Sequence, residues 1–175
     1  QGKLDTAIDH FEWAISFNPN FAEAHNNLGA TLLALGQIDA AVESYNMAVK
    51  IKPDYPQALN NQAIGLIRLG ENDAAIDSLE KALTLRPDYA SAHHNLSSLK
   101  NYSKGDIQIT KMQLLLSKNS LSQSDQKNLC FALAKAYEDI GQYDELFEVL
   151  HRGNKLCSLE IKSSLDEYKN NYLIF

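Results

Sequence analysis

The sequence predicts an all-α protein, a solenoid in which antiparallel helix pairs stack one upon the next. The first observation is an internal repeat with a period of 34 residues, in which glycine, aspartate, alanine and proline recur in register. The register is carried by Gly2, Gly36 and Gly70, by Asp5, Asp39 and Asp73, by Ala14, Ala48 and Ala82, and by Pro19, Pro53 and Pro87. The second is the helical spacing of apolar residues within each unit. Units of this length bury their apolar faces only against their neighbours, so a continuous stack is expected.

The first helix is expected over residues 5–17, where apolar residues fall on one face. Asn18-Pro19 ends it, because proline has no backbone N–H to continue a helix and biases the preceding residue away from helical geometry. By register this is the second helix of a pair. Residues 1–20 are therefore expected to be a half repeat whose first helix is missing.

Two complete helix pairs follow, at 22–35 with 38–51 and at 56–69 with 72–85, in repeats 22–55 and 56–89. Gly36 and Gly70 are expected to take the left-handed conformation that ends a helix and allows a tight turn. Small side chains are expected where the two helices of a pair approach closely. They are Ala41, Ala48, Ala75 and Ala82, with Tyr45 and Leu79 filling the remaining space.

The repeat degenerates after the first helix of the next unit, which is expected over residues 90–102. A short amphipathic helix is predicted at 106–117, and Ser122 with Asp125 resembles a capping box that starts the next helix. A displaced helix pair is predicted at 123–140 and 143–157, and a terminal capping helix at 159–173. The expected domains are a repeat array at 1–100, the irregular helix and displaced pair at 103–157, and the capping helix at 158–175.

Composition excludes several classes of function. The net charge is −6 and no long basic run occurs, which argues against nucleic acid as a partner. Apolar runs are short and the first residues lack a signal peptide, so we expect no membrane association and a cytoplasmic location. Cys130 and Cys157 are predicted to be free, buried thiols of a reducing compartment. No cofactor is predicted.

The repeat units resemble tetratricopeptide repeats. The family pattern is supplied by Leu28-Gly29, Gly36, Ala41, Tyr45, Ala48 and Pro53. The resemblance is clear over residues 2–100 and looser over 129–157, and Gln62-Ala63 departs from the expected leucine and glycine. It implies a right-handed superhelix whose concave groove is lined by the first helix of each pair. It also implies a non-enzymatic scaffold that binds a peptide or protein.

A narrower resemblance concerns the irregular half of the chain. Lys104-Gly105-Asp106, the segment from Phe131 to Asp139, and Gly153-Asn154-Lys155-Leu156 are similar to a linker in bacterial sulfotransferases that carry tetratricopeptide repeats. The resemblance implies an alternative function, a substrate-recruiting module whose catalytic domain lies beyond residue 175. The chain has no glycine-rich phosphate loop, so it is not expected to transfer sulfate itself.

The candidate binding residues lie on the predicted first helices. They are Asn26, Asn27, Asn60, Asn61, Arg68, His94 and Asn95. Side-chain amides both donate and accept, so a row of them suits the backbone of an extended peptide without reading its sequence. The alternative is that the asparagines bond between neighbouring helices and are purely structural. Arg68 is the only cation among the groove positions, so a clamp for terminal carboxylates is poorly supported.

Two further interpretations concern histidine and the chain ends. His25 and His93-His94 suggest a metal site only weakly, because His25 and His93 fall at bulky packing positions and lack acidic neighbours. Apolar residues of the first helix, including Trp13, and the terminal Leu173-Ile174-Phe175 are expected to promote self-association.

Overall fold

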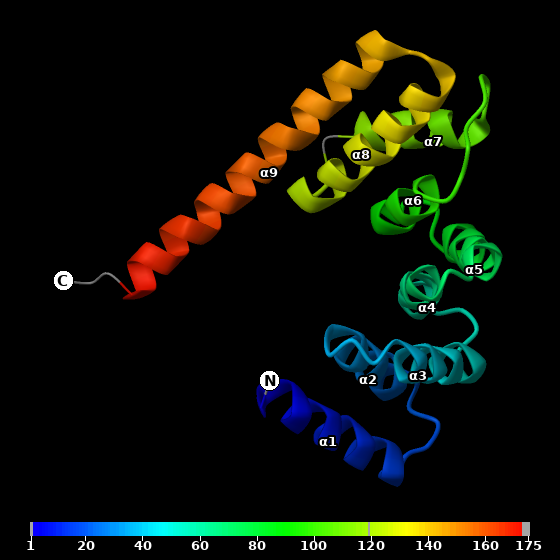
Figure 1. The fold of residues 1–175 in the computed structure, drawn as a ribbon, viewed down its shortest axis with the longest axis vertical. Helices are drawn as coiled ribbons and strands as arrows, with labels where there is room; N and C mark the ends of the chain where they lie inside the picture. The colour runs from blue at the N-terminus through cyan, green and yellow to red at the C-terminus, as the bar shows by residue number, and fades with distance from the viewer. Residues whose placement is uncertain (1, 119, 173–175) are drawn as a thin grey trace. The chain divides into compact units, whose positions relative to one another are not determined.

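The structure is a computed structural model that describes residues 2–118 and 120–172. These residues form nine α-helices and no β-strand (Figure 1). The helices are α1 (Gly2–Phe17), α2 (Ala22–Ala34), α3 (Ile38–Ile51), α4 (Pro56–Leu69), α5 (Asn72–Leu85), α6 (Ala90–Ser97), α7 (Ile107–Leu116), α8 (Gln123–Ile140) and α9 (Tyr143–Tyr172). The all-α prediction is confirmed. None of the helices, within the ranges described, has the length and apolarity needed to cross a bilayer.

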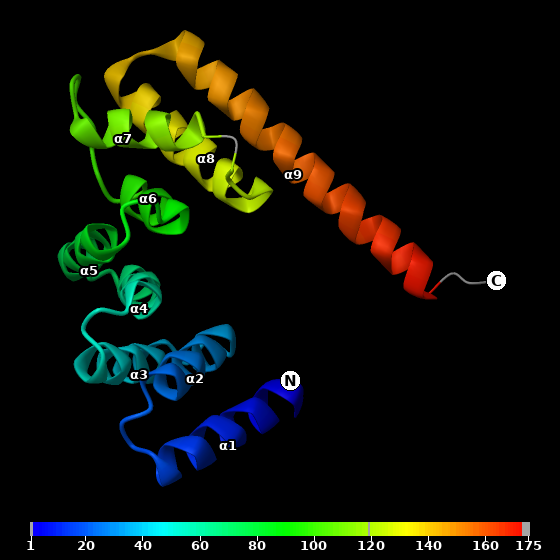
Figure 2. The ribbon, with the colours of Figure 1, turned by 180° about the vertical axis from the view of Figure 1, so that it is seen from behind.

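The chain divides into two compact units, Gln1–Leu96 and Ser97–Phe175. In the first unit α2 packs on α3 and α4 packs on α5, as the two complete repeats predict. Successive repeats are joined by contacts of α1 with α2, α3 with α4, and α2 with α4. In the second unit α8 packs along α9 and α7 packs on α8, which Figure 2 shows from behind.

The turn inside each helix pair is built on a glycine in the left-handed region. Gly36 has φ 79° and Gly70 has φ 80°, as predicted, and Gly141 has φ 72° between α8 and α9. The residue after each glycine donates its backbone N–H to a carbonyl of the preceding helix, from Gln37 to Leu32 at 3.0 Å and from Glu71 to Leu66 at 2.9 Å. These bonds satisfy carbonyls that a helix end would otherwise leave unpaired.

The core of the repeats is formed by the small residues that the register predicts. Ala41, Ala48, Ala75 and Ala82 are completely buried, and Tyr45 and Leu79 are at most 1% exposed. Gly29 faces this core so closely that a β-carbon there would lie 2.7 Å from Cε1 of Tyr45. Such a distance is too short for two carbons, so only glycine fits unless the ring moves. The close packing of small and large side chains is what joins the helices into one stack.

Helix α6 is shorter than predicted, because it ends at Ser97 rather than continuing to residue 102. The cause lies in the segment that follows. The backbone N–H of Tyr102 donates to a carboxylate oxygen of Asp139 at 3.0 Å, so it is not available for a helical bond. Lys100 forms a 2.7 Å ion pair with Asp106, and Asp106 in turn caps α7 by accepting from the N–H of Gln108 at 2.9 Å. These contacts hold the segment in a non-helical path.

Helix α9 also differs from the prediction. It runs without interruption to Tyr172, so the separate helices expected at 143–157 and 159–173 are one helix. Ser158, at the predicted break, directs its hydroxyl to the carbonyl of Asn154 at 3.0 Å, a bond that is compatible with helix. Ile161, within the predicted capping helix, is 62% exposed. The side chains of Leu165, Tyr168 and Tyr172, and residues 173–175, fall outside the described part of the structure.

The two thiols have different environments. Cys130 is fully buried and Cys157 is half-buried, and both are free. Burial raises the pKa of the Cys130 thiol, which keeps it protonated. A β-carbon on Gly153 would lie 3.3 Å from Cβ of Cys130, so α9 approaches α8 closely at this glycine. The prediction of free thiols is therefore confirmed, and full burial applies only to Cys130.

Candidate functional site

The predicted asparagines lie on the first helices of successive repeats, and their amides bond from one repeat to the next. Asn61 on α4 donates from Nδ2 to Oδ1 of Asn26 on α2 at 3.0 Å. Asn95 on α6 repeats the arrangement and donates from Nδ2 to Oδ1 of Asn60 on α4 at 2.9 Å. Each bond therefore links an asparagine of one repeat to the first asparagine of the Asn-Asn pair in the preceding repeat.

Burial separates the asparagines into two groups. Asn26 is 6% exposed and Asn60 is 3% exposed, whereas Asn27 is exposed and Asn61 is half-buried. The Nδ2 of Asn26 also donates to Oδ1 of Asn27 at 3.3 Å. The bonds of Asn26 and Asn60 are those of the structural alternative given above, because they connect neighbouring helices and lie beneath the surface.

Two amide groups on neighbouring repeats, those of Asn27 and Asn61, retain unused hydrogen-bonding capacity. A primary amide offers two N–H donors and a carbonyl oxygen with two lone pairs. Among the described residues, nothing donates to Oδ1 of Asn61, and nothing accepts from Nδ2 of Asn27. Together they offer one acceptor and one donor group on neighbouring repeats. This pairing matches the alternating N–H and C=O groups of an extended peptide.

The charge around these amides is sparse. Arg68 lies exposed in the last turn of α4 and forms no ion pair with any described residue. Burial raises the pKa of Tyr45 to about 12, and the positive charge of Arg68 opposes that rise. Glu23, on α2, is 3.1 Å from Nζ of Lys52 and is therefore neutralised locally. Its pKa is lowered by a hydrogen bond to its own backbone and by Lys52.

The histidines have structural surroundings. The ring Nε2 of His25 donates to the carbonyl of Pro19 at 3.0 Å, and Nε2 of His93 donates to the carbonyl of Pro87 at 2.9 Å. Both rings are buried and tie the loop before each first helix to that helix. His94, at the register position of Asn60, is half-buried on α6. Within the described ranges, histidine, cysteine and carboxylate side chains form no group that could hold a metal ion.

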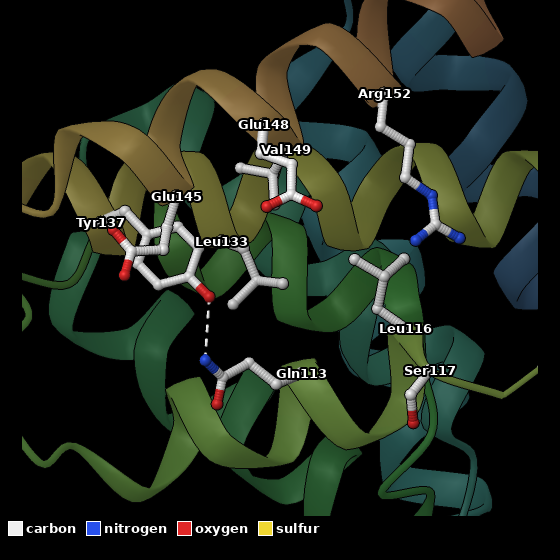
Figure 3. Close-up of a pocket in the computed structure, with 9 residues that line it drawn as sticks. All are labelled: Gln113, Leu116, Ser117, Leu133, Tyr137, Glu145, Glu148, Val149 and Arg152. Atoms are coloured by element: carbon white, nitrogen blue, oxygen red, sulfur yellow. Dashed lines mark hydrogen bonds between the residues drawn. The ribbon is translucent and has the colours of Figure 1, made fainter.

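A pocket in the second unit was not predicted from the sequence. It has a volume of about 240 Å³, is open to solvent, and is lined by residues of α7, α8 and α9 (Figure 3). Its lining residues are Gln113, Leu116, Ser117, Leu133, Tyr137, Glu145, Glu148, Val149 and Arg152. The sequence signal was the spacing of Glu145, Glu148 and Arg152, which places all three on one face of a helix. Sequence reasoning could not show that α7 and α8 close this face into a pocket.

Models of the tetratricopeptide repeat match several parts of the chain. One matches residues 22–55, a second matches residues 1–36 and 66–99, and a third matches residues 129–153. The third match covers part of α8 and the beginning of α9. The helix pair of the second unit is therefore also similar to this repeat. A search among curated proteins gave no match to the sequence.

Solved structures with the same fold include MamA, which is 23% identical, with 92% of this chain and 92% of MamA aligned and a TM-score of 0.68. A thermophilic tetratricopeptide-repeat protein of Thermus thermophilus is 22% identical over 99% of this chain and 92% of its own, with a TM-score of 0.64. The Cut9–Hcn1 hetero-tetramer of APC/C aligns at 20% identity over 90% of this chain and 31% of that chain, with a TM-score of 0.70. At these identities the likeness establishes the fold and not a shared partner.

Proposed function

We propose that this chain, an all-α solenoid of tetratricopeptide repeats, is a non-enzymatic scaffold that binds an extended segment of a partner protein along α2, α4 and α6. The observation that carries the proposal is the pair of open amide groups on neighbouring repeats, Nδ2 of Asn27 and Oδ1 of Asn61. Partly buried bonds from Asn26 to both residues orient the two amides before any ligand arrives.

Preorganisation is the physical advantage of this arrangement. Asn26 donates to Asn27 and accepts from Asn61, so neither surface amide rotates freely. A ligand then orders fewer side chains when it binds, which lowers the entropic cost of association. Each new hydrogen bond contributes only about 0.5–1.5 kcal/mol net, so affinity depends on several contacts together. We expect weak binding, in the micromolar range, with broad tolerance of sequence.

Charge favours a segment from within a chain over a free carboxyl terminus. Capture of a terminal carboxylate usually relies on several charge-assisted hydrogen bonds. Arg68 is the only cation among the predicted binding residues, and His94 contributes no fixed charge. The Cut9–Hcn1 assembly shows that a protein of this fold is part of a hetero-tetramer, which supports a protein as the partner class. We therefore assign Arg68 a secondary role, as a contact for a backbone carbonyl or an acidic side chain.

A selection with a phage-displayed library of random peptides tests the proposal. Peptides selected on the wild-type chain are then titrated by fluorescence polarisation against the double variant Asn27→Ala/Asn61→Ala. We expect about tenfold weaker binding, because two hydrogen bonds are lost. Asn154→Ala is the matched control, since Asn154 is an exposed asparagine of α9. Unchanged binding by a folded double variant would show that the partner site lies elsewhere.

The sulfotransferase module remains an alternative hypothesis about a longer protein. It is tested by the reading frame beyond residue 175. A phosphosulfate-binding loop in that frame would make this chain the recruiting part of an enzyme, and the asparagine surface would then hold the substrate.

A further inference from the structure

We propose that the pocket between α7, α8 and α9 is a second binding site, which takes a lysine or arginine side chain of a partner polypeptide. The pocket lies wholly within the second unit, so the proposal does not depend on the asparagine surface. Three features carry it: an apolar floor of the right size, an excess of hydrogen-bond acceptors, and a cation that is held away from the carboxylates.

The floor of the pocket suits the aliphatic stem of a basic side chain. Leu116, Leu133 and Val149 line it, and each is no more than 9% exposed. Lysine and arginine side chains place their methylene groups against apolar surface while their charged ends stay near polar groups. The volume of about 240 Å³ is below the range of roughly 300–1,000 Å³ that is typical for drug-sized ligands. It fits one side chain rather than a whole metabolite.

The polar part of the lining is rich in acceptors. Glu145 and Glu148 lie one helical turn apart on α9, and Figure 3 shows both above the apolar floor. Among the described residues, Glu148 forms no hydrogen bond or ion pair, and Glu145 accepts one long hydrogen bond, 3.5 Å from Nε2 of Gln142. Two unneutralised carboxylates beside a partly desolvated floor attract a cation more strongly than they would in open water.

Tyr137 adds a fixed polar group at the same end of the pocket. Its side chain is 5% exposed, and its hydroxyl accepts from Nε2 of Gln113 at 2.9 Å (Figure 3). This bond satisfies the hydroxyl oxygen, and the hydroxyl proton has no acceptor among the described residues. A carbonyl group of a bound polypeptide would accept it.

Arg152 does not neutralise the two carboxylates. It lies four residues after Glu148, a spacing that allows an ion pair on a helix. Instead its Nη2 donates to Oε1 of Gln126 on α8 at 2.8 Å, and it forms no ion pair with a described residue. Figure 3 shows Arg152 at the opposite end of the pocket from Glu145, above Leu116. The pocket therefore has an anionic end, formed by Glu145 and Glu148, that has no cationic partner among the described residues. At its other end the cation of Arg152 is bonded to Gln126.

Titration by nuclear magnetic resonance tests the site with a defined probe. Acetyl-Leu-Lys-Leu-amide is added to the full chain labelled at its methyl groups. We expect saturable shifts of the Leu116, Leu133 and Val149 methyl signals. Acetyl-Leu-norleucine-Leu-amide, which keeps the stem and lacks the charge, is the matched ligand control. Equal shifts with both peptides, or no shift with either, would overturn the proposal.

Charge-neutralising variants make the test specific for the carboxylates. Glu148→Gln and Glu145→Gln should each weaken binding of the lysine peptide about two- to fivefold, and both together about tenfold. Glu80→Gln, on exposed α5 surface, changes the net charge equally and should leave binding unchanged. Binding that is equally strong in the folded double variant would also overturn the proposal. Because Asn27→Ala/Asn61→Ala should not affect these shifts, failure here is distinguishable from failure of the asparagine surface.

Discussion

The side-chain Nδ2 of Asn61 lies 3.0 Å from Oδ1 of Asn26 and donates to it across the boundary between two repeats. The same bond recurs one period later between Asn95 and Asn60 at 2.9 Å. The inner member of each pair is buried and the outer member is nearer to the surface. The bond therefore joins neighbouring repeats through both of its asparagines. In the function proposed above, the outer asparagine is also the one that meets the ligand.

The inner and outer asparagines should differ in their effect on stability. Asn26→Ala removes the acceptor of the Asn61 amide in a largely buried setting, and we expect a loss of about 1–3 kcal/mol in the free energy of unfolding. Asn27→Ala, at the exposed neighbouring position, should change it by less than about 0.5 kcal/mol. Denaturant unfolding of both variants measures the difference. Equal stabilities would mean that the bond between repeats contributes nothing.

Enlarging a buried alanine should be costly. Ala41 and Ala75 are completely buried between helices, so Ala41→Leu and Ala75→Leu should each destabilise the protein by about 1–3 kcal/mol through overpacking. Ala74→Leu adds the same atoms at an exposed position one residue away on α5 and serves as the control. Thermal unfolding followed by circular dichroism is the measurement. If Ala75→Leu and Ala74→Leu have the same melting temperature, the assigned packing face is wrong.

The turn glycine tests backbone strain without steric interference. A β-carbon on Gly70 would meet nothing within 4 Å, but its φ of 80° is unfavourable for L-residues. Gly70→Ala should therefore cost about 1–2 kcal/mol of unfolding free energy. Gly70→Asn should cost less, because asparagine tolerates the left-handed conformation better. In a urea titration, the unfolding midpoint of Gly70→Asn should lie above that of Gly70→Ala. A lower midpoint for Gly70→Asn would contradict the backbone explanation.

Acid should loosen the segment between α6 and α7. The bond with Lys135 and the bond from the Tyr102 N–H hold the pKa of Asp139 below its ordinary value of 3.8. Burial would raise the pKa of Asp106, but the bonds from Lys100 and Gln108 outweigh it and lower that pKa too. Both carboxyls thus stabilise the fold above pH 3.8, and this contribution is lost as pH falls through their lower folded-state values.

The chemical shift of the Tyr102 amide proton reports the ionisation of Asp139 directly. This shift should titrate with a midpoint below 3.8, because the bonded carboxylate of Asp139 keeps its charge to lower pH. In Asp139→Asn the titration should vanish, and the stability of the variant should depend less on pH in the acid range. Asp125→Asn, at the start of α8, is a control far from this segment in sequence. A midpoint above 3.8 would refute the assigned bond.

The apolar surface of α1 should promote association. All residues of α1 are described and none is buried, and Trp13 and Phe17 are 66% and 73% exposed. Phe11 is only half-buried, whereas its register equivalent Tyr45 is 1% exposed. We expect concentration-dependent association in sedimentation equilibrium, weakened by Trp13→Glu and retained in His10→Glu, which adds a charge at an exposed polar position of α1. A wild-type chain that stays monomeric at high concentration would contradict this prediction.

Residue patterns along the chain were enough to predict the helices and most of their ends. The bounds of α3, α4, α5 and α8 agree with the residues predicted for them. These ends depend on signals within a few residues, such as the capping Ser122, whose hydroxyl accepts from the Asp125 N–H at 3.0 Å, and the turn glycines. Helix caps and turn glycines depend on residues that are close together in the chain, so their pattern and spacing are enough to predict them.

The tertiary structure alone decided the features that depend on residues far apart in the chain. Asp139 accepts the backbone N–H of Tyr102 from 37 residues away, and Asn26 accepts a hydrogen bond from the next repeat. The pocket of the second unit is lined by residues of three helices, α7, α8 and α9, and so depends on how these helices pack. Each of these outcomes is set by which partner a polar group meets when helices pack. The repeat register predicts the order of the helices, but it does not predict which partner each polar group meets.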